Sequence, residues 1–310
     1  MRYVFIVNPI AGKGKYEQTV LPKIEECFAQ NSLEYSVHIT KQAGESTQFV
    51  KNECLKGDDV TFFACGGEGT GLEVLNGMVG FSNATFAIFP SGSANDFLKY
   101  FNDKAAFLDL QNQIDGTAIP VDLIKAGDMY AINQCSVGMD ANVANDMKIF
   151  KKWPLVSGPL AYNLSVVKTF FGKIGNRIQI KIDGEDFGEK DCLFAVCANG
   201  PVYGGGYNSA PSAVPFDEKL EYVIINKISR PKILKFLGTY KAGKHQNLPF
   251  CKVGSCKSME IISKKPIPIN LDGEITLGTY AKFELVAKKV NFLLPKTVAE
   301  KYMEKELLKI

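Results

Sequence analysis

The sequence predicts a two-domain protein in which an open, mostly parallel α/β sheet is joined to an all-β domain of sandwich type. Its 310 residues exceed what one hydrophobic core usually serves. In the first third, apolar runs alternate with stretches of helical spacing, and from about residue 128 strictly alternating runs replace them. We therefore expect an α/β domain at 1–125, completed by C-terminal residues 291–310, and a β-sandwich domain at 126–290.

Four apolar runs predict the strands of the α/β domain, at 3–7, 34–39, 60–65 and 85–89. Between them, apolar residues recur at helical spacing, as at Val20, Ile24 and Phe28. Ligands of such sheets bind beyond the carboxyl ends of the strands. Because glycine-bearing segments follow three of these runs, we expect three loops to converge on one rim.

The second domain is predicted from strictly alternating polar and apolar residues. The run 177–183 alternates in this way and ends in Asp-Gly, which is typical of a half-buried antiparallel strand that enters a hairpin. Similar runs occur at 191–199, 219–228, 257–263 and 280–287. After Pro295, the segment 297–310 predicts a short amphipathic helix that covers another surface.

The composition excludes several classes of protein. A content of 46% hydrophobic and 22% charged residues is that of an ordinary globular chain rather than a disordered one. The net charge of +3 gives no support for nucleic acid as a partner. The apolar N-terminal stretch is too short for a secretory signal, and the eight cysteines form no CxxC pair, so we expect a cytoplasmic protein. With only two histidines, proton transfer falls to carboxylates.

The segment 66–77, GGEGTGLEVLNG, places a glycine-rich turn between a buried strand and a helix expected to begin near Leu72. The first three glycines would allow positive φ and bring backbone N–H groups close to an anion, and the helix N-terminus would add its positive end. Glu68 would hold a cation, directly or through water, because a carboxylate repels phosphate. The turn therefore indicates a nucleotide with its magnesium, and an ordinary strand-to-helix turn is the alternative.

Two further loops carry groups suited to the same ligand. The segment 8–15, NPIAGKGK, combines glycines with lysines but lacks the Walker spacing, so it is either a contact to nucleotide phosphates or a solvated turn. The segment 90–97, PSGSANDF, supplies hydroxyls, an amide and a carboxylate. Ser93 alone could be a helix cap, which would not explain the whole cluster. Asp96 beside Glu68 would form a two-carboxylate magnesium environment.

A late Asp-Gly-Glu segment is the candidate for proton transfer. Asp-Gly is the commonest hairpin turn signal, so a plain surface turn at 272–274 is one interpretation. The other is a carboxylate of the second domain that acts as general base for a substrate hydroxyl. We assign this role to Glu274, with Asp272 as a supporting ligand or orienting residue.

The segment 148–173 combines lysines and aromatic residues around an uncharged stretch that contains two prolines. Such a stretch cannot span a bilayer. Basic and aromatic residues that flank an apolar patch suit contact with a membrane or the mouth of a lipid cleft, and ordinary packing between domains is the alternative.

Taken together, these segments resemble the soluble diacylglycerol kinase catalytic family, which includes bacterial lipid kinases and the sphingosine and ceramide kinases. The resemblance covers nearly the whole chain. The matching motifs, in chain order, are NPxxG at 8–12, GGDGTxxEVxNG at 66–77, PxGTxNDF at 90–97, GxDAxV at 138–143, GxxxY at 158–162, a glycine tract followed by Ala-Pro at 204–211, and DGE at 272–274.

The resemblance implies a two-domain kinase with a Rossmann-like nucleotide domain, similar to phosphofructokinase and NAD kinase, and a β-sandwich domain for the lipid substrate. It implies ATP with Mg²⁺ as donor and a lipid hydroxyl as acceptor, with diacylglycerol converted to phosphatidic acid. Together with the loops above, it assigns nucleotide contacts to Asn8, Pro9, Gly12, Thr40, Gly66, Gly67, Glu68, Gly69, Thr70, Ser93 and Asn95. The expected metal-binding residues are Glu68, Asp96, Asp122 and Asp217.

Some positions depart from the family pattern. Glu68 replaces an aspartate, Ser93 a threonine and Leu72 an asparagine, while Asp217-Glu218 stands where Asp-Gly is usual. Two alternatives therefore stay open, a soluble-substrate kinase of the NAD kinase type and a non-catalytic module that binds lipid or nucleotide. The expected partner is a lipid at a membrane surface, contacted peripherally, and the sequence leaves open whether the chain forms a homodimer.

Overall fold

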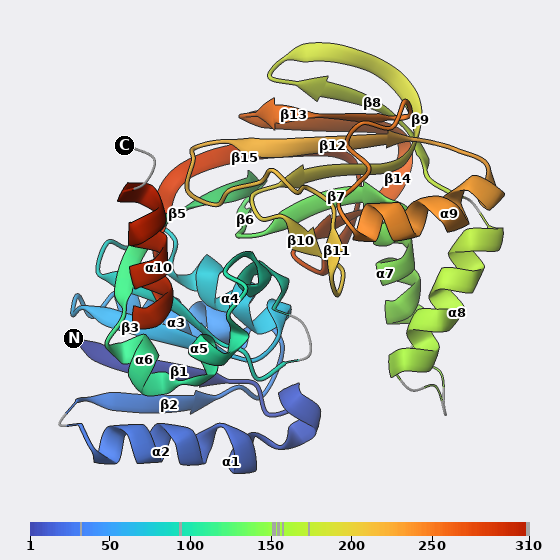
Figure 1. The fold of residues 1–310 in the computed structure, drawn as a ribbon. Helices are drawn as coiled ribbons and strands as arrows, with labels where there is room; N and C mark the ends of the chain where they lie inside the picture. The colour runs from blue at the N-terminus through green and yellow to red at the C-terminus, as the bar shows by residue number, and fades with distance from the viewer. Residues whose placement is uncertain are drawn as a thin grey trace. The chain divides into compact units, whose positions relative to one another are not determined.

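The computed structural model describes residues 1–310 except 32, 93–94, 151–152, 154–155, 157, 173 and 308–310. The chain divides into two compact units, here called unit 1 (1–121 and 288–310) and unit 2 (122–287). Two long strands, β5 (Thr117–Ala126) and β15 (Glu274–Leu294), carry the chain from one unit into the other (Figure 1).

Unit 1 contains a parallel sheet, as predicted. Its strands follow the order β15–β4–β3–β1–β2, with β1 (Arg2–Val7), β2 (Tyr35–Ile39), β3 (Val60–Cys65) and β4 (Ala84–Phe89). Every neighbouring pair in this order is parallel, including the last residues of β15 beside β4. The carboxyl ends of β1 to β4 therefore lie along one rim.

Helices flank this sheet, and their buried residues follow the predicted spacing. They are η1 (Ala11–Gly14), α1 (Tyr16–Thr19), α2 (Leu21–Ala29), α3 (Glu45–Cys54), α4 (Glu68–Met78), η2 (Asp96–Tyr100), α5 (Lys104–Leu108), α6 (Leu110–Ile114) and α10 (Lys296–Leu307). Val20, Ile24 and Phe28 join a buried cluster in which the rings of Phe5 and Phe63 stack with centroids 4.7 Å apart. Burial of this apolar surface is what holds the helices on the sheet.

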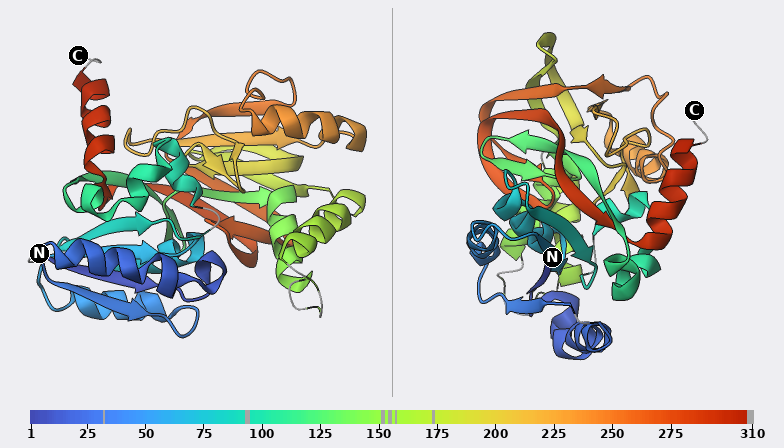
Figure 2. Two further views of the ribbon diagram at one scale, coloured as in Figure 1. Left: turned by 60° about the horizontal axis from the view of Figure 1, so that its bottom comes forward. Right: turned by 90° about the vertical axis from the view of Figure 1, so that its left-hand side faces the viewer.

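The C-terminal helix α10 belongs to unit 1. It lies beside α6 (Figure 2), and the Thr297 amide donates a hydrogen bond to Asn112 Oδ1 at 3.1 Å. Lys301 forms an ion pair with Asp103 at 3.0 Å. Within this helix Val298 and Ala299 are buried, whereas Met303 is exposed.

Unit 2 is built on antiparallel strands and contains the predicted β-sandwich. One ladder follows the order β13 (Cys251–Cys256), β12 (Leu220–Asn226), β9 (Glu185–Ala198), β7 (Gln134–Gly138), β14 (Ser258–Leu271) and β15. The remaining strands are β6 (Met129–Ala131), β8 (Asn176–Ile182), β10 (Val202–Tyr203) and β11 (Tyr207–Asn208). The helices are α7 (Met139–Phe150), α8 (Gly158–Phe171) and α9 (Arg230–Lys241).

Strand β9 shows how unit 2 buries two cores. Its residue Cys197 belongs to the cluster inside the sandwich, together with Phe283 of β15. Its neighbour Val196 points to the opposite face, where Phe236 and Tyr240 of α9 cover the sheet. Because successive side chains of a strand point to opposite faces, this central strand is apolar throughout rather than alternating.

Candidate active site

The rim of the parallel sheet in unit 1 gathers residues that come from separate sequence motifs. Asn8 follows β1, Thr40 follows β2 and Gly66 follows β3. Asn8 Nδ2 donates to the hydroxyl of Thr70 at 3.3 Å, and the Thr40 amide donates to the Val7 carbonyl at 2.9 Å. The loops after β1 and β3 thus meet at the carboxyl ends of the strands, where open sheets of this type bind ligands.

The glycines of these loops permit direct backbone contact between them. The Gly92 amide donates to the Gly66 carbonyl at 3.1 Å, and a Cβ atom on Gly92 would lie 2.7 Å from Gly67 Cα. A Cβ atom on Gly12 would lie 2.8 Å from the Ser91 carbonyl oxygen. Any other residue at these positions would push the three loops apart.

The conformation of the 66–70 turn corrects the expectation that its glycines have positive φ. Gly66, Gly67 and Gly69 are absent from the positive-φ residues of the described chain, and Gly67 is extended with φ −94° and ψ −165°. In contrast, Gly12 and Gly14 have positive φ of 59° and 73°. None of the three glycines after β3 provides left-handed backbone geometry, and Gly66 serves close approach, because a Cβ atom there would meet the Thr70 side chain.

The helix α4 begins at Glu68 and not near Leu72. The extended Gly67 precedes it directly as the N-cap residue, so Glu68, Gly69 and Thr70 form its first turn. Amides in the first turn of a helix have no acceptor within that helix, and they mark its positive end. This turn therefore fits the phosphate groups of a nucleotide, because it combines such amides with closely packed, bare glycines.

The structure joins Glu68 to Asp96 through the Asp96 backbone amide. Glu68 Oε1 accepts a hydrogen bond from the Asp96 amide at 3.4 Å. Asp96 is buried, and its Oδ1 accepts from Lys99 Nζ at 2.5 Å. Asn95 adopts a left-handed conformation and donates to the Gly66 carbonyl at 3.2 Å, which ties this loop to the strand end. Ser93, a predicted nucleotide contact, lies outside the described residues.

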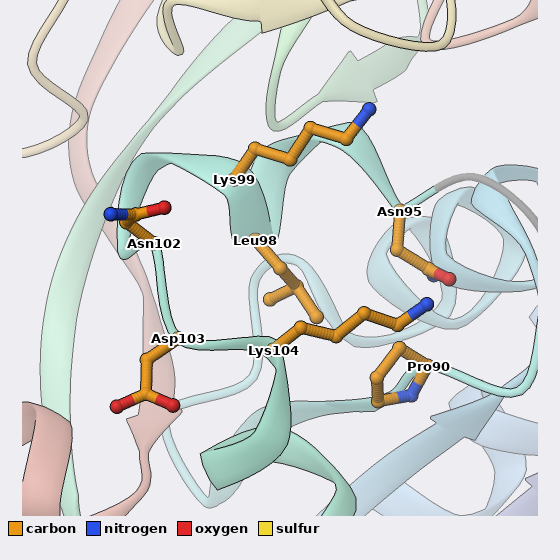
Figure 3. Close-up of a pocket in the computed structure, with 7 residues that line it drawn as sticks. All are labelled: Pro90, Asn95, Leu98, Lys99, Asn102, Asp103 and Lys104. Atoms are coloured by element: carbon orange, nitrogen blue, oxygen red, sulfur yellow. The ribbon is translucent and has the colours of Figure 1, made fainter.

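A pocket of about 200 Å³ adjoins the same loop (Figure 3). In Figure 3, Lys104 and Asn95 point toward one another beside Pro90. The sequence interpretation missed Lys99 and Lys104, although both follow the Asn-Asp-Phe motif closely. The full lining comprises Pro90, Asn95, Leu98, Lys99, Asn102, Asp103 and Lys104.

The second half of the 66–77 motif has a structural role. The carboxylate of Glu73 accepts hydrogen bonds from the amides of Gly44 at 2.8 Å and Ser46 at 3.2 Å, so it satisfies amides at the start of α3. A Cβ atom on Gly77 would lie 2.6 Å from the Thr47 carbonyl oxygen. These residues fix α3 against α4.

The other two acids expected to bind metal lie in unit 2. Asp122 is fully buried, and its Oδ2 accepts from the Glu218 amide at 2.8 Å. Asp217 is exposed, and its Oδ1 accepts from the Lys219 amide at 3.1 Å. Glu218 has a positive φ of 60°. In the part of the chain that the structure describes, no group of three or more His, Cys, Asp or Glu residues is arranged to hold a metal ion, so a metal here would need phosphate or water ligands as well.

Asp272 and Glu274 occupy one hairpin but differ in their surroundings. Asp272 accepts hydrogen bonds from the amides of Ile132 at 2.6 Å and Gln134 at 2.7 Å, and from Asn133 at 3.2 Å. It therefore anchors the hairpin to the start of β7. The Glu274 side chain is 51% exposed, and its Oε2 accepts from Lys148 Nζ of α7 at 2.9 Å.

The hairpin that carries Glu274 is also joined to a buried polar cluster. Asn270 Nδ2 donates to Ser136 Oγ at 3.3 Å, and Ser136 in turn donates to Asp140 Oδ2 at 2.5 Å. Burial raises the pKa of the Asp140 carboxyl, and burial also raises the pKa of the nearby Tyr203 hydroxyl. The sequence interpretation named neither Ser136 nor Tyr203, because neither belongs to a motif.

The fold and the rim define a class of protein in which a nucleotide-binding type of α/β unit is joined to a β-sandwich unit that carries a carboxylate hairpin. The family model for the diacylglycerol kinase catalytic domain matches residues 2–126, and that for the YegS C-terminal NAD kinase beta sandwich-like domain matches residues 133–294. The chain belongs to the diacylglycerol kinase catalytic family.

Individual relatives span almost the whole chain. The diacylglycerol kinase of Bacillus subtilis (strain 168) is 26% identical over 302 residues, which cover 95% of this chain and 97% of the relative. That of Staphylococcus carnosus (strain TM300) is 25% identical, with 94% and 95% covered. A solved structure of a diacylglycerol kinase from Bacillus anthracis str. Sterne is similar in fold, with a TM-score of 0.67, 19% identity and coverage of 96% and 98%.

Proposed function

We propose that this protein is a lipid kinase that transfers the γ-phosphoryl group of Mg-ATP to a lipid hydroxyl, with diacylglycerol as acceptor and phosphatidic acid as product. The observation that carries the proposal is the backbone contact of glycine loops at the rim of the sheet, beside the first turn of α4. Family membership and the names of the relatives support the acceptor. We further propose that it works in the cytoplasm, at a membrane surface.

In this proposal, unit 1 holds the nucleotide. The first-turn amides of α4 donate to phosphate oxygens, and the backbone of the 8–12 loop closes over the same anion. Magnesium, when bound, offsets the negative charge of the phosphates. Glu68 is proposed to hold it, because it is the acidic residue in the first turn of α4, where the phosphates would lie. Asp96, Asp122 and Asp217 are proposed as weaker contributors.

Proton transfer is assigned to unit 2. Glu274 accepts the proton of the lipid hydroxyl as that oxygen attacks the γ-phosphorus, and ADP leaves. Its exposed carboxylate supports this role, since a general base must reach its substrate. Asp272, which is held by three backbone amides, positions the hairpin and does not itself react.

The test is a transfer assay with ATP labelled in the γ-phosphoryl group. Purified protein is incubated with the labelled ATP and Mg²⁺ in three parallel reactions. Their acceptors are diacylglycerol in mixed micelles, a total lipid extract and NAD. We expect labelled phosphatidic acid that disappears when EDTA removes the metal. Label on NAD would favour a soluble-substrate kinase. Binding of Mg-ATP without any labelled product would favour a non-catalytic module.

A further inference from the structure

Helix α8 of unit 2 exposes large apolar residues along one face. Among the side chains of this helix that the structure describes, the buried ones are the small or hydroxyl-bearing residues Ala161, Ser165 and Thr169. Three large apolar residues point outward, with Leu160 44%, Val167 54% and Phe171 74% exposed, while Phe170 packs against a core cluster of unit 2. With the half-buried Leu164, they form what we call the α8 stripe (Leu160, Leu164, Val167 and Phe171).

The spacing of the α8 stripe makes it one continuous surface. Its residues are separated by four, three and four positions, and residues at this spacing lie on one face of a helix. A helix on a water-exposed surface normally turns its apolar face inward. The stripe is therefore suited to an apolar partner and not to water.

Polar contacts hold α8 in this orientation. The Arg230 guanidinium of α9 donates to the carbonyls of Phe170 and Gly172, each at 2.9 Å, at the C-terminal end of the helix. Lys168 forms an ion pair with Asp146 of the neighbouring helix α7 at 2.7 Å. Helices α7 and α8 pack against each other (Figure 1), while Leu160, Val167 and Phe171 of α8 stay exposed.

Basic residues of α9 adjoin the C-terminal end of α8. Helix α9, whose first residue contacts the end of α8, carries four cations and no acidic residue. Its residues Arg230, Lys232 and Lys235 are exposed. In the sequence, the segment 145–173 contains five lysines and one aspartate, a net charge of +4. A second copy of this chain would bring like charges face to face, whereas an anionic surface would be attracted.

We propose that the α8 stripe, with the cations of α9, docks the protein onto an anionic lipid bilayer. The apolar side chains enter the interfacial region while lysine and arginine contact the headgroups. No described helix is long and apolar enough to cross a membrane. The contact that we propose is peripheral. The proposal rests on the proposed function for its purpose, because a bilayer is where a diacylglycerol acceptor resides.

The test measures binding of the full chain to vesicles by sedimentation, without ATP. Vesicles of phosphatidylglycerol and phosphatidylcholine are compared with phosphatidylcholine alone. We expect binding to the anionic vesicles that weakens as salt rises. The double variant Val167→Asn/Phe171→Asn should bind about tenfold more weakly or worse, because two apolar side chains no longer leave water. Lys232→Gln/Lys235→Gln should reduce the preference for anionic vesicles.

The matched control is Leu55→Asn. Leu55 lies in unit 1 and is 65% exposed, so its substitution removes an exposed apolar side chain elsewhere. It should leave vesicle binding unchanged. Circular dichroism of each variant establishes that it is folded. Equal vesicle binding by the folded stripe variant and the wild type would overturn the proposal. A wild-type dimer that becomes a monomer in the stripe variant would overturn it in favour of self-association.

Kinase assays separate this proposal from the proposed function. Loss of vesicle binding by the stripe variant, with transfer to a short-chain diacylglycerol in detergent micelles retained, supports docking as a separate step. If no lipid is phosphorylated by the wild type but vesicle binding still depends on Phe171, the docking proposal stands and the proposed function fails.

Discussion

Glu274 and Asp272 lie two residues apart, yet their contacts differ. Glu274 keeps one ion pair and an exposed carboxylate, while Asp272 is held by three amides. Phosphoryl transfer depends mainly on positioning and on charge neutralisation. A positioned general base contributes by accepting the proton of the attacking hydroxyl. The pair therefore allows a catalytic and a positioning role to be tested within one turn.

Glu274→Gln should lower kcat by about 10²-fold or more, because an amide cannot accept the hydroxyl proton. Binding of Mg-ATP should be unchanged. The matched control is Glu284→Gln on the same strand, since the Glu284 side chain is similarly exposed at 43% and also pairs with a lysine. Turnover of Glu274→Gln equal to that of the control would remove Glu274 from this role.

Asp272→Asn should chiefly affect stability. Its amide has one acceptor oxygen where the carboxylate has two, so backbone amides at 132–134 lose a partner. We expect a loss of about 1–3 kcal/mol in the free energy of unfolding. Urea denaturation measures it, with Asp217→Asn as control, because exposed Asp217 accepts only a local amide among the described contacts. An unchanged unfolding midpoint would contradict the anchoring role.

Glu221 makes stability depend on pH. Burial is the main cause that raises the pKa of its carboxyl from 4.5 to about 7. The folded state therefore binds the proton more tightly than the unfolded state. Its contribution to stability is full below pH 4.5 and is lost as the pH rises towards 7. Glu221→Gln should thus stabilise the protein at pH 8 by about 1–2 kcal/mol after allowance for solvent screening.

Thermal unfolding of Glu221→Gln and wild type at pH 5 and pH 8 measures this difference. The two proteins should be close in stability at the lower pH and differ at the higher one. A variant less stable than wild type at pH 8 would show that the carboxylate is stabilised in the fold by groups that outweigh its burial.

At the scale of an element, α4 combines two functions along its length. Its first turn faces the rim, and its later turns pack against α3 through Gly77. Gly77→Ala should cost about 1–3 kcal/mol, because the added Cβ atom would meet the Thr47 carbonyl and Val50. Unfolding by urea measures this loss.

Gly71 in the same helix provides the matched control. A Cβ atom there would lie 3.8 Å from the Phe86 ring, an ordinary contact. Since alanine favours helix over glycine, Gly71→Ala should be neutral or stabilising by up to about 1 kcal/mol. Equal losses for both substitutions would indicate that glycine at position 77 is not required for packing.

At the scale of the whole molecule, the two units should respond differently to nucleotide. Mg-ATP should slow amide hydrogen exchange in segments 8–12 and 66–70 of unit 1, because bound ligand stabilises the loops that contact it. Exchange in α9 of unit 2 should be unchanged, and removal of Mg²⁺ should reduce the protection. Protection confined to unit 2 would contradict the assignment of the nucleotide to the glycine loops.

The sequence predicted the parallel sheet well because its signals are local. Continuous apolar runs and glycine punctuation identify β1, β3 and β4, and helical spacing identifies α2. It failed at the start of α4, where the glycines suggested a longer loop. The packing of Gly92 against Gly67 is long-range and leaves no local signal.

The partners of the candidate site residues were likewise beyond the sequence. Nothing in the neighbourhood of Asp272 points to the amides at 132–134, which lie far away along the chain. Lys148 was grouped with other lysines, but its ammonium pairs with Glu274. The outward face of α8 also needed the structure, because spacing defines a face without saying which way it points.

The chain by itself determined its element types, its family and the residues able to do chemistry, because propensity, periodicity and motif spacing act over a few residues. Tertiary structure decided which of those residues are engaged by the fold and which stay accessible. The physical reason is that hydrogen bonding and burial depend on neighbours brought together by folding, as Asp272 in its cradle of amides and the exposed Glu274 illustrate.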